Sequence, residues 1–501
     1  MMYFRSQLLE LFTAIGILNQ LPKKILISLL ISNLTLANFS FAQTSQIQLP
    51  SLGETSSSVI SMDLELQIGE AWLRSFYRQT PLNRDYLLQD YIEKLVQQLK
   101  PYSQINYSDL RIVVVDNPTM NAFAVPGGVI GIHSGLLLHA GTEDELASVI
   151  AHEMAHLSQR HFARSVAAQQ AMGMASMAGL LAAVVLAATA GGDAGLAMMS
   201  VAQGAAIESQ LRYSRQNETE ADRIGQSTLV TAGRDPKGAV RMFEKMLAAT
   251  RYAGDLAPEY LLTHPLPQSR VIDTETRANQ YASRIYSENP SYQLMAARVK
   301  VADNETPEIA LRNSGNAYRL TPNSNLAKYG YTLALKDTRH YSEAMELATE
   351  LLEGNQTNLV FQSLYAELLL LSDQADLALK YLLSLLTPGT QNHVITMQLA
   401  DTYKAQNLFE QTADILQAHS QERPKDPIVW YELAEAYGLS GNIYELHLAR
   451  SKYFELVGSF QQAIEHVRLA KRQLGDNKIE QAVLDQRIRQ ISQTQSREMD
   501  L

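Results

Sequence analysis

Two histidines and a glutamate with metal-site spacing lie in the stretch VIAHEMAHLSQRH, residues 149–161. On a helix, His152 and His156 are one turn apart and share a face, so both imidazoles can reach a single metal ion. Glu153 lies one step round the helix, where it can hold a water molecule on that metal. The same spacing also arises in helices whose histidines are ordinary surface or core residues. The motif alone therefore leaves a catalytic metal site and a plain helix both open.

A catalytic zinc ion takes three protein ligands and leaves one position for water, so a third ligand must come from elsewhere. His161 lies five residues after His156, and on the same helix it would face roughly 100° or more away from the shared face. Gln159 and Phe162 stand where a metzincin carries its glycine and third histidine, which excludes that class. An acidic ligand from a second helix is the alternative that remains.

A second helix with suitable acids is predicted in SRQNETEADRIGQ, residues 214–226. Glu218 and Asp222 are four residues apart and share one face, whereas Glu220 points elsewhere and is interpreted as a solvated acid. We expect Glu218 to ligate the metal. Asp222 would then hydrogen-bond a ligating histidine or donate a proton during catalysis. Taken alone, these acids are more typical of a charged, solvent-facing helix.

Four blocks of sequence occur together and in a fixed order. They are NAFAVPGGVIGIHSGLL, HEMAH, the Glu-x-x-x-Asp segment at 218–222, and THPLPQSR at 263–270. This set resembles the M48 family of zinc metallopeptidases. The resemblance implies an α+β fold, a gluzincin-like domain that is mostly helical with a small sheet, and one Zn²⁺ per chain.

The same resemblance implies roles for individual residues. His152, His156 and Glu218 would hold zinc, and Glu153 would move the proton during peptide hydrolysis, with Asp222 assisting. The absence of cysteine agrees with a His and Glu ligand set, because no thiolate ligand is available.

His264 and Arg270 are separate candidates in the THPLPQSR block. One interpretation makes His264 an ordinary loop histidine with a capping role. The other is that it reaches the open position of the metal in a resting state, or contacts the transition state together with Arg270.

The elements that must position these residues can be read from periodicity. Helical spacing runs through 61–100, and LRIVVVD at 110–116 is typical of a strand. Residues 121–138 predict a strand, a Pro-Gly-Gly turn, a second strand and the start of a helix. The zinc-type helix is expected over 141–162, with Thr142 as its cap. We expect VIGIHS, 129–134, to be the sheet edge to which a substrate chain adds.

The N-terminus is typical of an export signal, with an uncharged apolar stretch at 25–37 and a small-residue cleavage motif ending at Ala42. We expect a signal peptide over 1–42 and a flexible Ser/Thr/Gln-rich leader over 43–60, a retained membrane anchor being the alternative. A net charge of −10 does not suggest a nucleic-acid partner. Export together with the lack of cysteine favours a bacterial periplasm.

An Ala/Met-rich segment at 165–207 carries almost no charge. It predicts a helical hairpin that packs on the protein or makes a peripheral membrane contact, and its length leaves a transmembrane pair as the alternative. We assign 61–285 to the metalloprotease domain that contains this hairpin.

The second half of the chain repeats every 34 residues. Small or matching residues recur in several columns, including Ala310, Ala344, Ala378 and Thr412. This period predicts a tetratricopeptide repeat domain over 290–495, which would bind peptides or proteins. After Gly441 the register is expected to loosen, with 460–473 as one displaced second helix.

Together these features predict a zinc-dependent endopeptidase of the periplasm. The resemblance implies that it degrades misfolded or stalled outer-membrane proteins, assists their assembly as a chaperone, and contacts the assembly machinery through its repeats. Its expected substrates are unfolded or misassembled proteins. Two alternatives are a repeat-based chaperone or scaffold whose zinc site is largely idle, and a membrane-integral quality-control protease.

Overall fold

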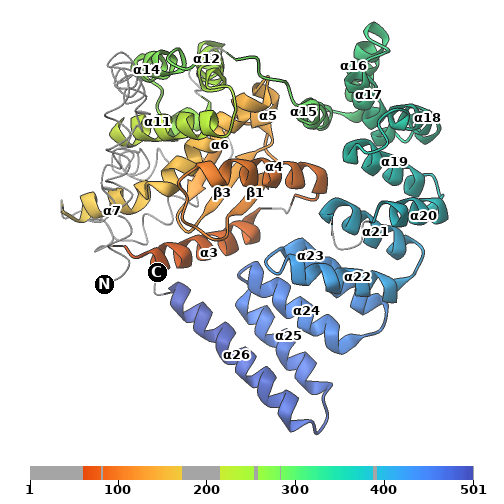
Figure 1. The fold of residues 1–501 in the computed structure, drawn as a ribbon. Helices are drawn as coiled ribbons and strands as arrows, with labels where there is room; N and C mark the ends of the chain where they lie inside the picture. Colours follow the sequence, from red (N-terminus) through yellow and green to blue (C-terminus); the bar gives the residue numbers. More distant parts are fainter. Residues whose placement is uncertain are drawn as a thin grey trace, which may run out of the picture. The chain divides into compact units, whose positions relative to one another are not determined.

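The computed structural model describes residues 60–80, 83–171, 215–252, 258–282, 284–386 and 392–499 (Figure 1). The expected signal peptide at 1–42, all but the last residue of the leader at 43–60, and most of the 165–207 hairpin lie outside the described residues. In the part of the chain that is described, no helix combines the length and apolar composition needed to cross a membrane. The export signal and the membrane contact therefore stay predictions.

The first half of the described chain is a small sheet surrounded by helices, which confirms the α+β expectation. Its elements are α3 (Met62–Gln79), α4 (Tyr86–Leu99), β1 (Arg111–Val115), β2 (Ala122–Val125), β3 (Val129–His133), α5 (Gly135–His139), α6 (Glu143–Ser158), α7 (His161–Ala171), α11 (Arg215–Thr231), α12 (Lys237–Tyr252), α13 (Glu259–Thr263) and α14 (Gln268–Ala278).

The sheet has the strand order β1-β3-β2. β1 runs parallel to β3, with Arg111 opposite Val129, and β2 runs antiparallel to it, with Phe123 opposite Gly131. The expectation that 129–134 forms a free edge is therefore wrong, because β3 is paired on both sides. The reason is long-range: β1 joins the outer side of the hairpin made by β2 and β3. The edge strand that packs against α6 is β2.

Helix α6 begins as the sequence predicts but ends earlier. The hydroxyl of Thr142 accepts a hydrogen bond from the backbone N–H of Glu145, which caps the helix N-terminus. The helix ends at Ser158, and Arg160 then takes a left-handed conformation with φ of 51°. The Arg160 guanidinium donates to Glu65 and to the carbonyl of Ile60, so contacts with the N-terminal part of the fold hold the break. Residues after Arg160 therefore start a new helix, α7.

Helix α11 packs closely against α6. Gly225 makes this approach possible, because a Cβ at that position would lie only 3.0 Å from the backbone nitrogen of His152. The close contact brings the α11 face that carries Glu218 and Asp222 against the α6 face that carries the histidines. A larger residue at 225 would push the two helices apart.

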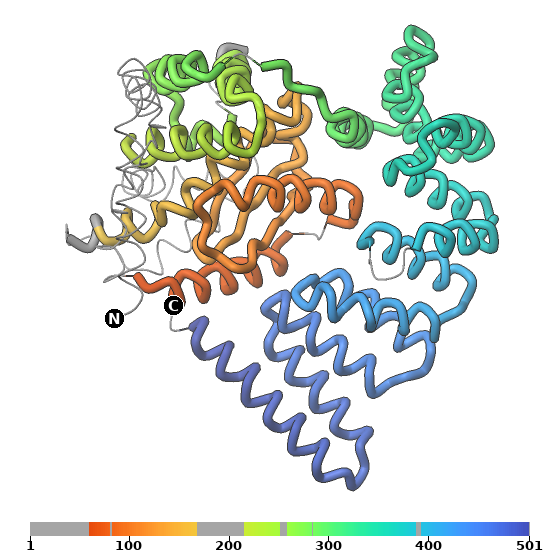
Figure 2. Tube along the Cα trace, in the orientation of Figure 1, coloured from red at the N-terminus to blue at the C-terminus, as the bar shows by residue number. Residues whose placement is uncertain are grey.

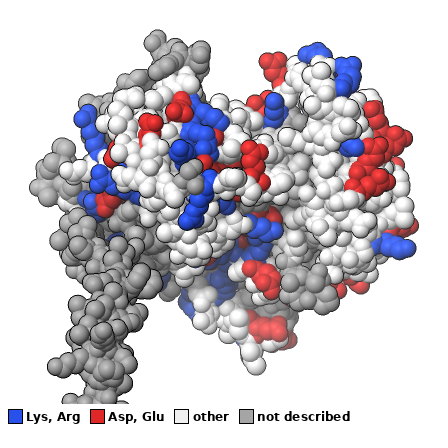
Figure 3. Space-filling view, turned by 45° about the horizontal axis from the view of Figure 1, so that its top comes forward, with Lys and Arg blue, Asp and Glu red and all other residues white. Residues whose placement is uncertain are grey.

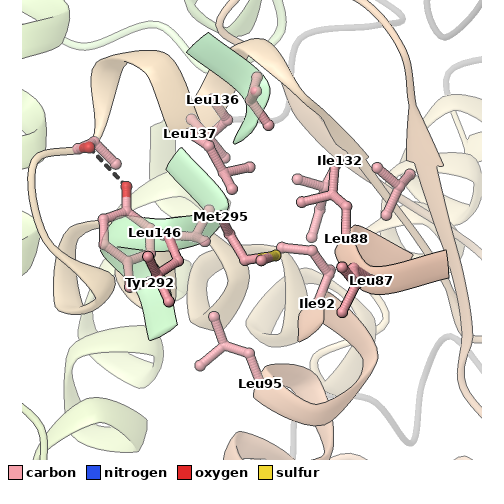
Figure 4. Close-up of a cluster of buried hydrophobic side chains, with 14 of the residues drawn as sticks. Leu87, Leu88, Ile92, Leu95, Ile132, Leu136, Leu137, Leu146, Tyr292 and Met295 are labelled. Atoms are coloured by element: carbon pink, nitrogen blue, oxygen red, sulfur yellow. Dashed lines mark hydrogen bonds between the residues drawn. The ribbon is translucent and has the colours of Figure 1, made fainter. Parts of the chain in front are cut away.

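One hydrophobic core joins the sheet, its helices and the first helix of the second half, α15 (Pro290–Ala302). Figure 4 shows side chains from α4, β3, α5, α6 and α15 in this core, with Tyr292 donating a hydrogen bond of 2.6 Å to the carbonyl of Ala140. Fully burying a Leu or Met side chain stabilises a fold by about 1.5–3 kcal/mol. Met295 and Tyr292 thus anchor α15 to the first half of the chain.

The second half consists of helix pairs, and Figure 2 follows their trace. The helices after α15 are α16 (Pro307–Leu320), α17 (Asn325–Asp337), α18 (Tyr341–Leu352), α19 (Leu359–Leu371), α20 (Ala375–Leu385), α21 (His393–Ala405), α22 (Phe409–Glu422), α23 (Pro427–Leu439), α24 (Ile443–Leu456), α25 (Phe460–Arg472) and α26 (Lys478–Met499).

The starting residues of these helices confirm the 34-residue period. First helices begin at 325, 359, 393 and 427, and second helices at 307, 341, 375, 409 and 443. From α17 onward, the turns inside the pairs repeat as well, because each contains one left-handed residue. These are Arg339, Asp373, Asn407, Gly441 and Gly475, again 34 residues apart.

The register does not loosen after Gly441 as expected. α25 begins 33 residues after α23, and α26 begins 35 residues after α24. Residues 460–473 are therefore the first helix of a further pair, not a displaced second helix. The sequence obscured this because the connection between α24 and α25 is a short turn at Val457–Ser459 rather than a proline-marked break.

Polar contacts join the repeats to the first half of the chain. Arg423, after α22, donates two hydrogen bonds to Glu93 of α4, at 2.8 and 3.0 Å. Beside them, β1, α4 and the segment between α22 and α23 line a cavity of about 500 Å³. Charged side chains of both signs are interspersed over the face drawn in Figure 3, and acidic ones gather at its right-hand margin.

Candidate metal centre

The two histidines of α6 converge on one point. The Nε2 atoms of His152 and His156 lie 2.9 Å apart, and both side chains are buried. This follows from the helix register, because residues four apart project from the same face. Two imidazole nitrogens so close together match a pair that shares a cation.

Glu218 and His264 complete this cluster. Glu218 lies 3.4 Å from Nε2 of His152 and 3.5 Å from Nε2 of His156, and His264 Nδ1 lies 3.2 Å from each carboxylate oxygen of Glu218. One ligand atom from each of the four residues falls within 4.8 Å of all the others. His264 stands at the C-terminal end of α13, whereas Glu218 comes from the first turn of α11.

The spacing of these atoms fits a zinc ion. Nitrogen and oxygen ligands about 2.0–2.2 Å from a tetrahedral zinc lie roughly 3.3 Å from one another. The separations of 2.9–3.5 Å among His152, His156 and Glu218 agree with that geometry. A buried set of imidazoles with one carboxylate is also typical of zinc sites, whereas calcium and magnesium are bound mainly by oxygen ligands.

Glu153 lies beside the cluster in a different electrostatic state from Glu218. Its side chain is fully buried, neither of its oxygens makes a hydrogen bond within the described part of the chain, and burial raises its pKa. Burial also opposes ionisation of Glu218, but His264 and the α6 histidines hold the pKa of that carboxyl well below its ordinary value. Carboxyls whose pKa values are pushed apart in this way are typical of one ligand and one general base.

Asp222 and Arg270 form the outer side of the cluster. Asp222 Oδ1 lies 3.0 Å from Nδ1 of His152, and Arg270 donates to both oxygens of Asp222. Despite burial, these hydrogen bonds hold the pKa of Asp222 below its ordinary value, so it is a carboxylate. Of the two roles expected for Asp222, this geometry favours orienting His152 over donating a proton.

Arg270 is buried beside two carboxylates of the site. Its guanidinium is buried between Asp222 and Glu218, 2.9 Å from Glu218 Oε2, and it stacks over the ring of Phe243. It therefore compensates two buried carboxylates. The structure brings all seven predicted site residues together. Asp222 and Arg270 contact the ligand cluster from outside and are not part of it.

Sequence reasoning missed two neighbours of the cluster. Tyr260 stacks on His264 with 4.6 Å between ring centroids, and His161 Nδ1 lies 2.8 Å from Nδ1 of His156. His161 reaches this position because α7 starts a new direction after the break at Arg160. Tyr260 depends on how α13 docks, through its backbone N–H on the carbonyl of Met120. The spacing of Tyr260 four residues before His264 is the one local signal.

Comparison with known proteins places these residues in a family. Residues 86–278, which include every residue of the cluster, match peptidase family M48. A putative beta-barrel assembly-enhancing protease of Vibrio cholerae is 32% identical over 468 residues, which cover 92% of this chain and 96% of that protein. The chain belongs to peptidase family M48. It is a metalloprotease, and the four residues of the cluster described above could hold a metal ion.

Further relatives differ in how much of this M48 peptidase they cover. The beta-barrel assembly-enhancing protease of Escherichia coli K12 is 31% identical over 489 residues, 95% of this chain and 98% of that protein. The mitochondrial metalloendopeptidase OMA1 of Arabidopsis thaliana is 33% identical over 159 residues, 32% of this chain and 30% of its own. Among solved structures, the tetratricopeptide repeat protein YrrB is 19% identical, with a TM-score of 0.25, over 36% of this chain and 90% of its own.

Proposed function

We propose that this protein is a zinc-dependent endopeptidase of the periplasm that cleaves misfolded or stalled outer-membrane proteins. The observation that supports this most strongly is the buried cluster of His152, His156, Glu218 and His264 beside the fully buried carboxyl of Glu153. Two relatives that align over nearly the whole chain are named beta-barrel assembly-enhancing protease, which supports protease activity and a role in beta-barrel assembly.

The residues of the cluster support one mechanism. His152, His156 and Glu218 would hold zinc, which when bound would supply a Lewis acid for the peptide carbonyl and for the attacking water. Glu153 receives the proton from that water and delivers it to the leaving amine. Its burial and raised pKa suit both steps, because a base must also serve as the acid that follows. Asp222 holds the His152 ring in place during the reaction.

His264 gives the site a resting form in this proposal. Its ring lies 3.2 Å from Glu218 and 3.6 Å from Glu153. In this proposal an attacking water would have to occupy the same space. Tyr260 stacks on the ring and supports that position. Displacement of His264 would open the site, which suits a protease that must spare folded proteins.

Substrate binding is proposed at the free edge of β2. The backbone N–H of His133 donates to the carbonyl of Asn121, so the alternation of an antiparallel pair directs the backbone groups of Ala122 and Ala124 away from β3. An extended polypeptide can pair with these groups next to α6. Backbone pairing selects unfolded segments with little regard to side chains.

The repeats would recruit the outer-membrane protein assembly machinery. Solenoids of helix pairs present long surfaces for peptide or protein partners. The cavity lined by β1, α4 and the segment joining α22 to α23 is one place where such a partner could dock. Membrane contact through 165–207 remains part of the proposal.

A Glu153→Gln variant tests the proposal in cells. It should bind zinc and retain the fold, yet fail to remove misfolded outer-membrane proteins in a strain that lacks the native gene. Full cellular activity of this variant would instead identify the protein as a chaperone or scaffold with an idle zinc site. Carbonate extraction of the mature protein separates a peripheral from a membrane-integral form.

A further inference from the structure

A chain of three side chains stands behind His156, on the side away from the cluster. His161 is fully buried, and its Nδ1 lies 2.8 Å from Nδ1 of His156. On the other side of the ring, its Nε2 lies 3.3 Å from Oε2 of Glu220. Arg164 donates to the same carboxylate oxygen at 2.8 Å. Glu220 is thus half-buried and paired, not the solvated acid that its position on α11 predicted.

The direction of the hydrogen bonds from His156 through His161 follows from the carboxylate of Glu220 at the far end of this row of side chains. Glu220 is paired with Arg164, and a carboxylate only accepts, so Nε2 of His161 carries the proton. A neutral imidazole then has an acceptor at Nδ1, and the hydrogen of the 2.8 Å contact must belong to Nδ1 of His156. His156 with its proton on Nδ1 presents a lone pair at Nε2, the atom that faces His152 and Glu218.

We propose that His161 is a positioning residue that fixes the tautomer and ring orientation of His156 for metal binding, with Glu220 and Arg164 holding His161 in turn. This inference rests on the proposed zinc site. It gives each α6 histidine its own outer partner, Asp222 for His152 and His161 for His156. It also gives the break at Arg160 a purpose, because an unbroken helix would direct residue 161 away from His156.

A nearly isosteric pair of variants tests the role of Nδ1 of His161. His161→Asn keeps an acceptor oxygen near the position of Nδ1, whereas His161→Leu has a similar shape and no acceptor. Loss of a partner behind a metal ligand typically costs roughly 10–100-fold in metal affinity. The Leu variant should weaken zinc binding by that factor in a chelator competition, and the Asn variant should stay close to wild type. Equal zinc affinities of the two variants would overturn the proposal.

Two further measurements keep the test independent of folding and of catalysis. Glu220→Gln, at a half-buried position, should alter the visible spectrum of the Co²⁺-substituted protein and weaken zinc binding. An unchanged spectrum and affinity would count against the proposal even if His161→Leu cannot be purified. His340→Leu, at an exposed histidine of the repeats, is the control. Failure of the wild-type chain to bind zinc would instead refute the proposed function, so the two failures are distinguishable.

Discussion

Arg270 donates hydrogen bonds to both carboxylate oxygens of Asp222, at 2.7 and 2.8 Å, and so holds this acid against His152. The pairing engages both oxygens of Asp222. Asp222 is therefore expected to act through His152, and its contribution should appear in zinc binding before it appears in the chemical step.

Asp222→Asn is expected to weaken zinc binding roughly 10–100-fold, because the neutral amide no longer fixes the proton on Nδ1 of His152. Chelator competition measures this directly. Asp273→Asn, at a more exposed acid on α14, should leave zinc affinity unchanged. Wild-type zinc affinity combined with lost hydrolysis would assign Asp222 the proton-donor role instead.

His264→Ala is expected to accelerate hydrolysis of an unfolded protein. If the resting form is favoured by about 1.4 kcal/mol, removing its histidine raises the rate about 10-fold at saturating zinc. Zinc affinity should fall at the same time, because one of the four ligand atoms is lost. His139→Ala, at an exposed histidine on α5, is the matched control. An unchanged rate would show that His264 neither blocks nor assists the reaction.

Ala124→Pro tests the edge of β2. Proline is tolerated on edge strands, and the N–H removed at this position makes no bond to β3. Loss of one backbone hydrogen bond to the substrate costs about 1 kcal/mol, or roughly 5-fold in kcat/KM. Ala124→Gly keeps the N–H and should cleave at the wild-type rate. The edge is not the substrate site if both variants behave alike while their melting temperatures match that of the wild type.

The stacked pair of His393 and His419 should make stability depend on pH. Burial, aided by Arg423, lowers the pKa of His419 to about 4 and lowers that of His393 as well. An unfolded histidine titrates near 6.5, so between about pH 4 and 6.5 the unfolded chain binds more protons. Stability is therefore complete above pH 6.5 and falls on acidification, by up to about 3 kcal/mol for His419.

Urea unfolding at pH 5.0 and 7.5 measures this effect. His419→Gln should reduce the difference in unfolding free energy between the two pH values, while His340→Gln should leave it as in the wild type. A pH dependence of equal size in all three proteins would show that the buried pair does not titrate on unfolding.

Local patterns predicted more of this molecule than long-range ones. The register of a helix places His152 beside His156, and the same reasoning joins Glu218 to Asp222, so the sequence predicts each pair, while the packing of α11 on α6 brings the two pairs together. The break at Arg160 depends on Glu65, nearly a hundred residues earlier, and no local pattern shows it. For this reason His161 could only be read as facing away.

The predictions for the sheet edge and for the last repeat were wrong for related reasons. Alternation identifies β3 as a strand, but the number of its neighbours depends on where β1 pairs. After Gly441 the helices begin within one position of the 34-residue spacing. The turn that connects them lacks proline, and the residue types no longer match at positions 34 apart, so the sequence pattern is less clear than the structure.

The most direct test of the central claim is hydrolysis of an unfolded outer-membrane protein by purified protein of known zinc content. The metal-free chain should be inactive and should recover full activity with one zinc per chain. Glu153→Gln should bind the same zinc yet cleave roughly 10²–10⁴-fold more slowly, the usual contribution of a general base. Hydrolysis that persists without zinc, or at the wild-type rate in Glu153→Gln, would contradict the account.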